Sequence, residues 1–152
     1  TAEQMRTLPD FFADIPDPRR GQGRRHPLPV VLAIAAAATL CGMRGYQAIS
    51  LWAKDLGQKA RARFRCCYRD RHYLVPSRTV IREVLTRVDP DHVDRALQAW
   101  NACYAASDEA LAIDGKTLCK AVDEQGRQTH ILGVVGHQTQ TCYAKKKSAP
   151  CP

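Results

Sequence analysis

The chain has 152 residues, of which 45% are hydrophobic and 25% are charged, and its formal net charge is +8. This length and composition allow one ordinary domain, or a small domain with part of another, and they exclude a disordered chain. The longest apolar run, Val30–Cys41, is shorter than the roughly 20 residues that a membrane-spanning helix needs, so we expect no membrane partner. Seven irregularly spaced cysteines without a C-x-x-C pair predict neither a disulfide framework nor a zinc site, and they favour a reducing, cytoplasmic location.

The positive charge is concentrated in one part of the chain. Residues 19–78 hold 13 basic and 2 acidic side chains, an excess of +11, whereas the remainder holds 10 basic and 13 acidic side chains, a balance of −3. A concentrated basic region is typical of proteins that bind a polyanion, because neutralising phosphates releases condensed counterions. Nucleic acid is the usual partner of this kind, and a solvated basic surface without a partner is the alternative.

The first 29 residues predict a short helix followed by a basic loop. Asp10 is a suitable N-cap for a helix that carries Phe11 and Phe12. Prolines and glycines within residues 16–29 then interrupt regular structure. The arginines of this loop present several forked donors, which suit phosphate oxygens: Arg19, Arg20, Arg24 and Arg25.

Apolar spacing predicts a helical bundle over the next part of the chain. Residues 29–40 are rich in alanine and apolar on every face, which predicts the buried central helix of the bundle. Helical spacing continues over residues 45–53 and 58–64, and a basic loop is expected over residues 66–76. A further helix is expected to begin at Asp89-Pro90-Asp91 and to end near Ala106.

Residues 78–88 predict an amphipathic helix with Ser77 as its N-cap. Arg78 and Arg82 stand four residues apart on the face opposite the apolar one. A helix, a basic turn and a helix with arginines near its start are typical of helix-turn-helix DNA readers, although the connecting loop is longer than in that motif. An ordinary amphipathic helix with a solvated face is an equal alternative.

After a boundary at residues 107–109 the pattern changes to strands. Short apolar or alternating segments at residues 110–113, 131–135 and 141–144, with a turn at residues 123–126, favour an antiparallel meander. The expected organisation is a helical domain, a strand-forming segment and an irregular tail, at residues 1–107, 108–144 and 145–152.

Asp114 is the acidic residue that stands out, because it follows the apolar strand and precedes Gly115-Lys116-Thr117. A carboxylate at a strand end can hold a metal ion, and Lys116 beside it can steer a phosphate. Taken alone, an Asp-Gly pair at a strand end is more often an ordinary turn.

Blocks of sequence, in order, are similar to the H-repeat-associated class of DDE-type insertion-sequence transposases. They cover much of the chain between residues 8 and 144 and are specific as a set: residues 8–28 (LPDFFADIPDPRR through GRRHPL), 40–46 (LCGMRGY), 75–77 with 81–85 (VPS and IREVL) and 112–118 (AIDGKTL). The resemblance implies a helical N-terminal associated domain followed by a ribonuclease H-like α/β catalytic domain, here incomplete and limited to its first three antiparallel strands. It also implies an Asp-Asp-Glu triad that holds two divalent ions, usually Mg²⁺, with Asp114 as the first carboxylate and a metal ligand.

The chain also departs from the family pattern. After Asp114 the only acidic residues are Asp123 and Glu124, in the expected turn, so the other two triad carboxylates have no candidates. Cys119 stands where the family tends to carry a basic residue, and residues 145–152 resemble a truncated or out-of-frame end.

Three functions stay open. The first is a transposase fragment that binds the terminal inverted repeats of a mobile element, with an incomplete triad, no strand transfer by itself and Mg²⁺ at most weakly held. The second is a non-catalytic DNA-binding protein or regulator of transposition, and the third is an interaction module for another polyanion. A homo-oligomer is left open. The residues expected to contact DNA are Arg19, Arg20, Arg24, Arg25, Arg78 and Arg82, with Lys116 near Asp114.

Overall fold

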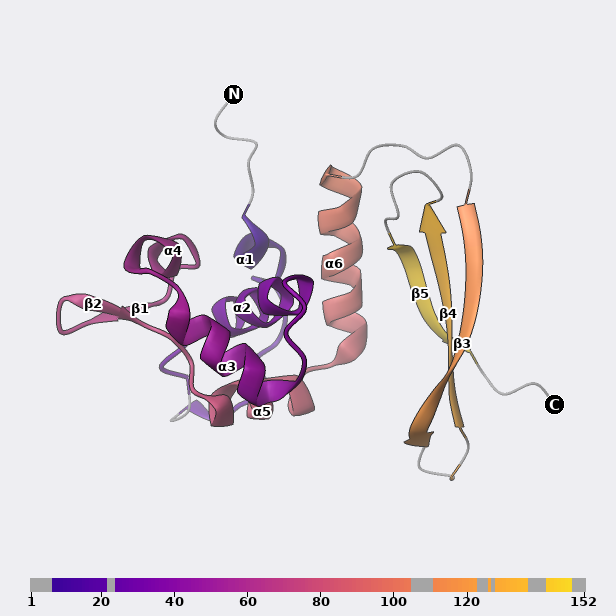
Figure 1. Cartoon of the computed structure of the whole chain (residues 1–152), viewed down its shortest axis with the longest axis horizontal. Coiled ribbons are helices and arrows are strands. Elements are labelled where there is room, and N and C mark those ends of the chain that lie inside the picture. Colours follow the sequence, from indigo (N-terminus) through magenta and orange to yellow (C-terminus); the bar gives the residue numbers. More distant parts are fainter. Residues whose placement is uncertain are drawn as a thin grey trace. The chain divides into compact units, whose positions relative to one another are not determined.

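The computed structural model describes residues 7–21, 24–104, 111–122, 126, 128–136 and 142–148. The chain divides into two compact units, Thr1–Val93 and Asp94–Pro152. Among the described residues, the first unit contains five helices and a β-hairpin, and the second contains most of a sixth helix and a three-stranded sheet (Figure 1).

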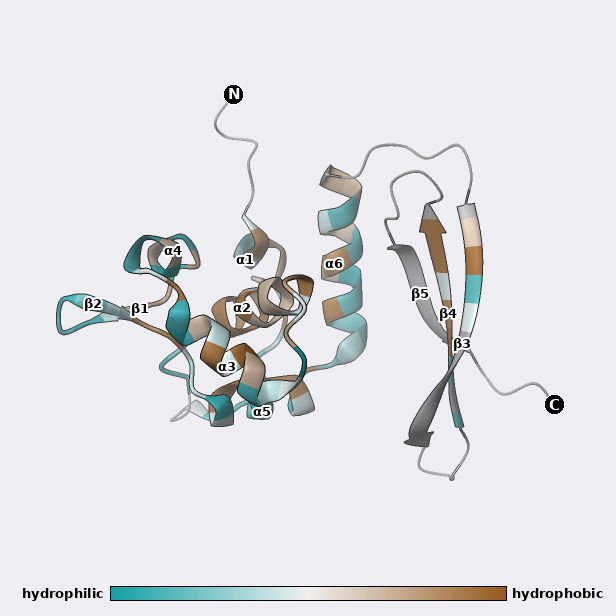
Figure 2. Cartoon of the chain, in the orientation of Figure 1, coloured by the Kyte–Doolittle hydropathy of each residue, from teal (hydrophilic) through white to brown (hydrophobic). Residues whose placement is uncertain are grey.

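Helix α2 (Leu28–Leu40) is the centre of the first unit, as its sequence predicts. It contacts α1 (Leu8–Phe11), α3 (Gly45–Asp55) and α5 (Arg78–Arg87), and Figure 2 shows it as mostly hydrophobic. Its interior residues, such as Ile34, have no exposed surface. In the described part of the chain no single helix is long and apolar enough to cross a membrane, although α2 and α3 together pass that test across a bend of 99°.

Helix α1 begins differently from the sequence-based expectation. Its N-cap is Thr7, and Asp10 lies inside the first turn. The Asp10 carboxylate accepts hydrogen bonds from the backbone N–H and the hydroxyl of Thr7, both at 2.7 Å, and from Nη1 of Arg65 at 2.6 Å. These bonds, with that from the Thr7 hydroxyl as the largest cause, hold the pKa of Asp10 below its ordinary value. The predicted Asp10 cap was therefore wrong by one helical turn.

Residues 66–76, expected as a loop, contain a β-hairpin. After α4 (Gln58–Arg63), strands β1 (Cys67–Arg69) and β2 (His72–Leu74) pair in antiparallel register. Tyr68 and Tyr73 lie opposite each other with ring centroids 4.8 Å apart, a cross-strand contact that favours pairing. The strands were not predicted from the sequence because basic residues lie between the two tyrosines, and the segment therefore lacks the alternation of apolar and polar residues that indicates a strand.

Helix α5 confirms its predicted cap and its two faces. The Ser77 hydroxyl accepts a hydrogen bond from the backbone N–H of Val80 at 3.4 Å. Ile81 and Val84 have no exposed surface, and the helix packs against α2 and α3. Arg78 and Arg82 are exposed on the other face.

Helix α6 (Pro90–Tyr104) begins where the sequence predicts. The Asp89 carboxylate accepts a hydrogen bond from the backbone N–H of Asp91 at 2.9 Å, which stabilises the first turn. The expected end of this helix near Ala106 and the boundary at residues 107–109 lie outside the described residues. The domain limits expected from the sequence stay a prediction.

The second unit confirms the predicted antiparallel meander, with longer strands. Strands β3 (Leu111–Val122), β4 (Gln128–Gly136) and β5 (Cys142–Ser148) lie in the order β3-β4-β5. β3 continues past Asp114, where the expected strand ended, and β5 takes in three lysines of the expected irregular tail. Pairing of the backbone with β4 overrides the weak strand preference of lysine. Of the expected turn at residues 123–126, only Gly126 is described, with a φ of +76°.

Candidate nucleic-acid interface

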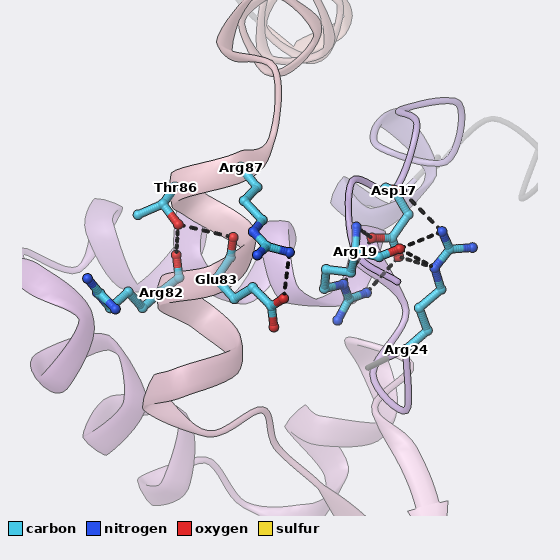
Figure 3. Close-up of polar contacts among 7 residues, drawn as sticks. All are labelled: Asp17, Arg19, Arg24, Arg82, Glu83, Thr86 and Arg87. Atoms are coloured by element: carbon cyan, nitrogen blue, oxygen red, sulfur yellow. Dashed lines mark hydrogen bonds and ion pairs between the residues drawn. The ribbon is translucent and has the colours of Figure 1, made fainter. Parts of the chain in front are cut away.

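The arginine loop, residues 17–26, is built around a buried ion pair. Arg19 Nε and Nη2 donate to the two carboxylate oxygens of Asp17 at 2.9 and 2.8 Å (Figure 3). Nη2 also donates to the carbonyl of His26 at 2.8 Å. The Arg19 side chain has 0% exposed surface. The fork of Arg19 is buried and holds the loop together, so the structure gives this arginine a structural role, and its contact with phosphate stays a prediction.

Arg24, near the other end of the loop, bonds back to its first residues. Its Nε and Nη2 donate to the Arg19 carbonyl at 3.0 and 2.7 Å, and its Nε lies 3.7 Å from the Asp17 carboxylate. The pKa of Asp17 lies below its ordinary value, chiefly because Arg19 donates to it and in part because Arg24 is near. With 49% of its side chain exposed, Arg24 combines a structural contact with a surface position.

The remaining arginines of the loop, Arg20 and Arg25, are exposed. His26 beside them is buried, and its Nδ1 has no hydrogen-bond partner among the residues that the structure describes. Burial, followed by the nearby charges of Arg25 and Arg19, lowers the pKa of His26. The loop thus presents two solvent-facing arginines on a frame that Asp17, Arg19 and Arg24 hold in place.

Helix α5 presents a second basic group. Arg78 and Arg82 are exposed and lie one turn apart near the start of the helix. Arg87, near its end, is paired with Glu83 at 3.0 Å, and the Thr86 hydroxyl donates to the carbonyls of Arg82 and Glu83 (Figure 3). In this view the Arg82 side chain points away from the arginine loop, so the two basic groups are separate.

Two arginines that the sequence did not single out hold the first unit together. Arg61 donates from Nε, Nη2 and Nη1 to the carbonyls of Leu56, Lys54 and Tyr73 at 2.8, 2.6 and 3.1 Å. Arg65, with a φ of +59°, reaches back to Asp10. Part of the +11 excess in residues 19–78 therefore also makes structural contacts, although the Arg65 side chain stays 59% exposed.

The structure places Asp114 within β3 and not at a strand end. Asp114 pairs in register with Gly133 of β4 and is exposed, so the expected strand-end position was wrong. The backbone of Lys116 pairs with Ile131, and the Lys116 side chain lies outside the described part of the structure. The backbone hydrogen bonds of β4 hold Asp114 in an extended segment.

The family model described as DDE_Tnp_1-associated matches residues 9–101. The chain belongs to this family, the N-terminal associated domain of DDE transposases. The match begins in α1, takes in the arginine loop, the hairpin and α5, and ends within α6. It confirms the family resemblance seen in the sequence.

A relative of this DDE-transposase-associated chain is an uncharacterized protein in the dhlA 3′ region of Xanthobacter autotrophicus. It is 28% identical over 147 residues, which cover 90% of this chain and 46% of that protein. The chain therefore spans less than half the length of this relative. No solved structure matches the chain.

The carboxylates of this family member that the structure describes do not fit a two-metal centre. No group of three or more His, Cys, Asp or Glu residues that could hold a metal ion occurs among the described residues. Asp123 and Glu124, which follow Asp114 in the sequence, lie outside them. A two-metal site needs several carboxylates around the ions, and the described strands β3, β4 and β5 supply Asp114 alone.

Proposed function

We propose that this chain binds DNA as the end-recognition part of a DDE transposase, with the terminal inverted repeats of a mobile element as its target. The observation that carries the proposal is the outer face of α5, where Arg78 and Arg82 are exposed while Ile81 and Val84 fix the inner face. The major groove admits one α-helix, and residues near the start of a recognition helix are those that reach base edges.

The arginine loop supports the proposal as a phosphate-contacting element. Arg20 and Arg25 are exposed, while the bonds of Arg19 to Asp17 and to the His26 carbonyl fix the backbone on either side of them. Phosphate contacts position a protein on a duplex, and base contacts then supply sequence preference. We assign positioning to Arg20, Arg25 and the exposed half of Arg24, and sequence reading to α5.

The catalytic part of the proposal concerns the second unit. We propose that β3, β4 and β5 are the first strands of a ribonuclease H-like domain, with Asp114 as the first carboxylate of the triad. The antiparallel order of the strands and the exposed position of Asp114 on the first of them support this assignment. Asp114 is the single carboxylate on the described strands β3, β4 and β5, and a two-metal site needs several, so we expect no DNA cleavage or strand transfer from this chain by itself.

A second candidate is a regulator that occupies element ends without cutting them. The position of Asp114 as the single carboxylate on the described strands β3, β4 and β5 supports this candidate. It shares the DNA-binding surface with the first candidate, and the two separate in a transposition assay with the full-length transposase. A regulator lowers the transposition frequency when it is supplied in excess, whereas a chain that contributes only binding within the complete enzyme has no effect.

The binding test uses the whole chain and two labelled duplexes, one with the inverted repeats that flank the gene and one with the same bases scrambled. Affinity is measured by fluorescence anisotropy at two salt concentrations. Arg82→Gln is compared with Arg87→Gln, which removes the same charge from the same helix at a position already paired with Glu83. We expect Arg82→Gln to weaken binding to the repeat severalfold and Arg87→Gln to leave it nearly unchanged.

Two results would contradict the proposal. Equal binding to both duplexes would remove end recognition and leave a nonspecific basic surface. No binding to either duplex at low salt would show that the exposed arginines of α5 and the arginine loop are solvated charges without a DNA partner.

A further inference from the structure

The β1–β2 hairpin is a basic, exposed element that projects from the helices of the first unit (Figure 1). Arg69, Arg71 and His72 are exposed at or beside its tip, and Tyr68 has 59% of its surface exposed. Figure 2 shows the tip as hydrophilic. Basic side chains next to an exposed aromatic ring are a combination suited to nucleic acid, which offers both phosphates and base or sugar surfaces.

The base of the hairpin is fixed to α4. The side-chain oxygen of Gln58 accepts a hydrogen bond from the backbone N–H of Tyr73 at 2.7 Å. Arg61 Nη1 donates to the Tyr73 carbonyl at 3.1 Å, and the two remaining donors of Arg61 hold the segment before α4. Both main-chain groups of Tyr73 are thus bound, so the tip extends from a supported base.

The turn of the hairpin places an arginine where glycine would be more favourable. Asp70 and Arg71 have φ values of +50° and +65°, the left-handed conformation at both central positions of a two-residue turn. In such turns the second position favours glycine, because a side chain there adds strain. Arg71 is exposed, so packing does not account for it, and its charge is what it adds to the tip.

We propose that the tip of this hairpin is a second DNA-contacting element, in which Arg71 and Arg69 contact phosphates of the same duplex that α5 reads. The inference rests on the proposed function. Only residues 75–77 separate β2 from α5, so Leu74 and Arg78 are at most about 14 Å apart. Arg71, at the tip, lies three residues before Leu74 and is therefore at most about 25 Å from Arg78. A duplex carries one phosphate for about every 1.7 Å of its axis, so it offers phosphates over the whole of that reach.

The test compares Arg71→Gly with Arg71→Lys in the whole chain. Glycine favours the turn and removes the charge, whereas lysine keeps both the charge and a side chain at the strained position. The probe is the inverted-repeat duplex, and its affinity is measured at four salt concentrations. We expect Arg71→Gly to weaken binding severalfold and to lower the salt slope by about one, while Arg71→Lys binds like the unmodified chain.

Arg44→Gln, which removes one exposed charge at the start of α3, is the matched control. An equal loss in this control would mean that only net charge matters and would overturn the hairpin contact. If Arg71→Gly binds normally while Arg82→Gln is weakened, the hairpin inference fails and the proposed function stands. If the unmodified chain binds no DNA, both fail.

Discussion

Arg19 Nη2 donates a hydrogen bond to the Asp17 carboxylate at 2.8 Å from a side chain that has no exposed surface. This pair lies two residues apart in sequence, and it fixes the loop that carries Arg20 and Arg25. Arg19, which the sequence predicted as a DNA contact, therefore stabilises the conformation of the loop.

We expect Arg19→Met to lower the free energy of unfolding by about 1–3 kcal/mol, because it removes the main hydrogen-bond donor of Asp17, which is partly exposed and keeps Arg24 nearby. Arg20→Met, on the adjacent exposed residue, should change it by less than about 0.5 kcal/mol. Urea denaturation followed by circular dichroism measures both. A similar small effect for the two variants would mean that the Asp17–Arg19 pair does not support the loop.

Stability should also depend on pH through His26. Its pKa is lowered in the folded chain by burial, so the unfolded chain binds the proton first as the pH falls. The unfolded state then gains stability from about pH 6.5 downward, and the free energy of unfolding decreases until the folded-state pKa is passed. Denaturation of the unmodified chain and of His26→Gln at pH 8 and pH 5.5 measures this. The variant should lose less stability than the unmodified chain between these two pH values, and an equal loss would assign the effect to other groups.

Stability should depend on the side chains of the buried face of α5. Ile81 has no exposed surface, so Ile81→Ala should lower the free energy of unfolding by about 2–5 kcal/mol. Val80, half-buried on the same helix, is the comparison, and Val80→Ala should cost clearly less. Thermal denaturation of both variants measures the two losses of stability. A larger loss for Val80→Ala than for Ile81→Ala would contradict the assignment of the buried face.

The support of the hairpin by α4 can be measured at one amide. Gln58 accepts the hydrogen bond of the Tyr73 N–H, so Gln58→Ala should speed hydrogen exchange at Tyr73. Gln47→Ala, on the exposed surface of α3, should leave that exchange rate unchanged. Exchange at Tyr73 that is equally fast in all three proteins would mean that this bond does not protect the hairpin in solution.

Helical parts of the chain were predictable because their signals are local. The apolar run that forms α2, the Ser77 cap and the amphipathic spacing of α5 each specify the element without reference to distant residues. The family resemblance was likewise carried by contiguous blocks. These signals sufficed for the bundle and for the position of its exposed arginines on α5.

The rest depended on contacts that local patterns do not reveal. The hairpin turns on Asp70-Arg71, where the sequence signal for such a turn would be Asp-Gly. The lysines of β5 adopt a strand because β4 lies alongside them. Arg19 was expected at the surface because arginine usually lies there, and its burial follows from the Asp17 carboxylate and the His26 carbonyl.

Some arginines of this chain face solvent and others bond to the backbone or to carboxylates, and this difference affects how a mutational scan should be interpreted. Alanine at Arg20, Arg25, Arg71, Arg78 or Arg82 removes a solvent-facing charge and leaves the backbone supported. Alanine at Arg61 removes the donors to three carbonyl groups, and alanine at Arg65 removes a link between the end of α4 and α1. If the chain binds DNA as proposed, both kinds of variant would weaken that binding, so a scan that measures binding alone would count structural arginines as DNA contacts. Paired melting curves would separate the residues that touch a ligand from those that shape the protein around it.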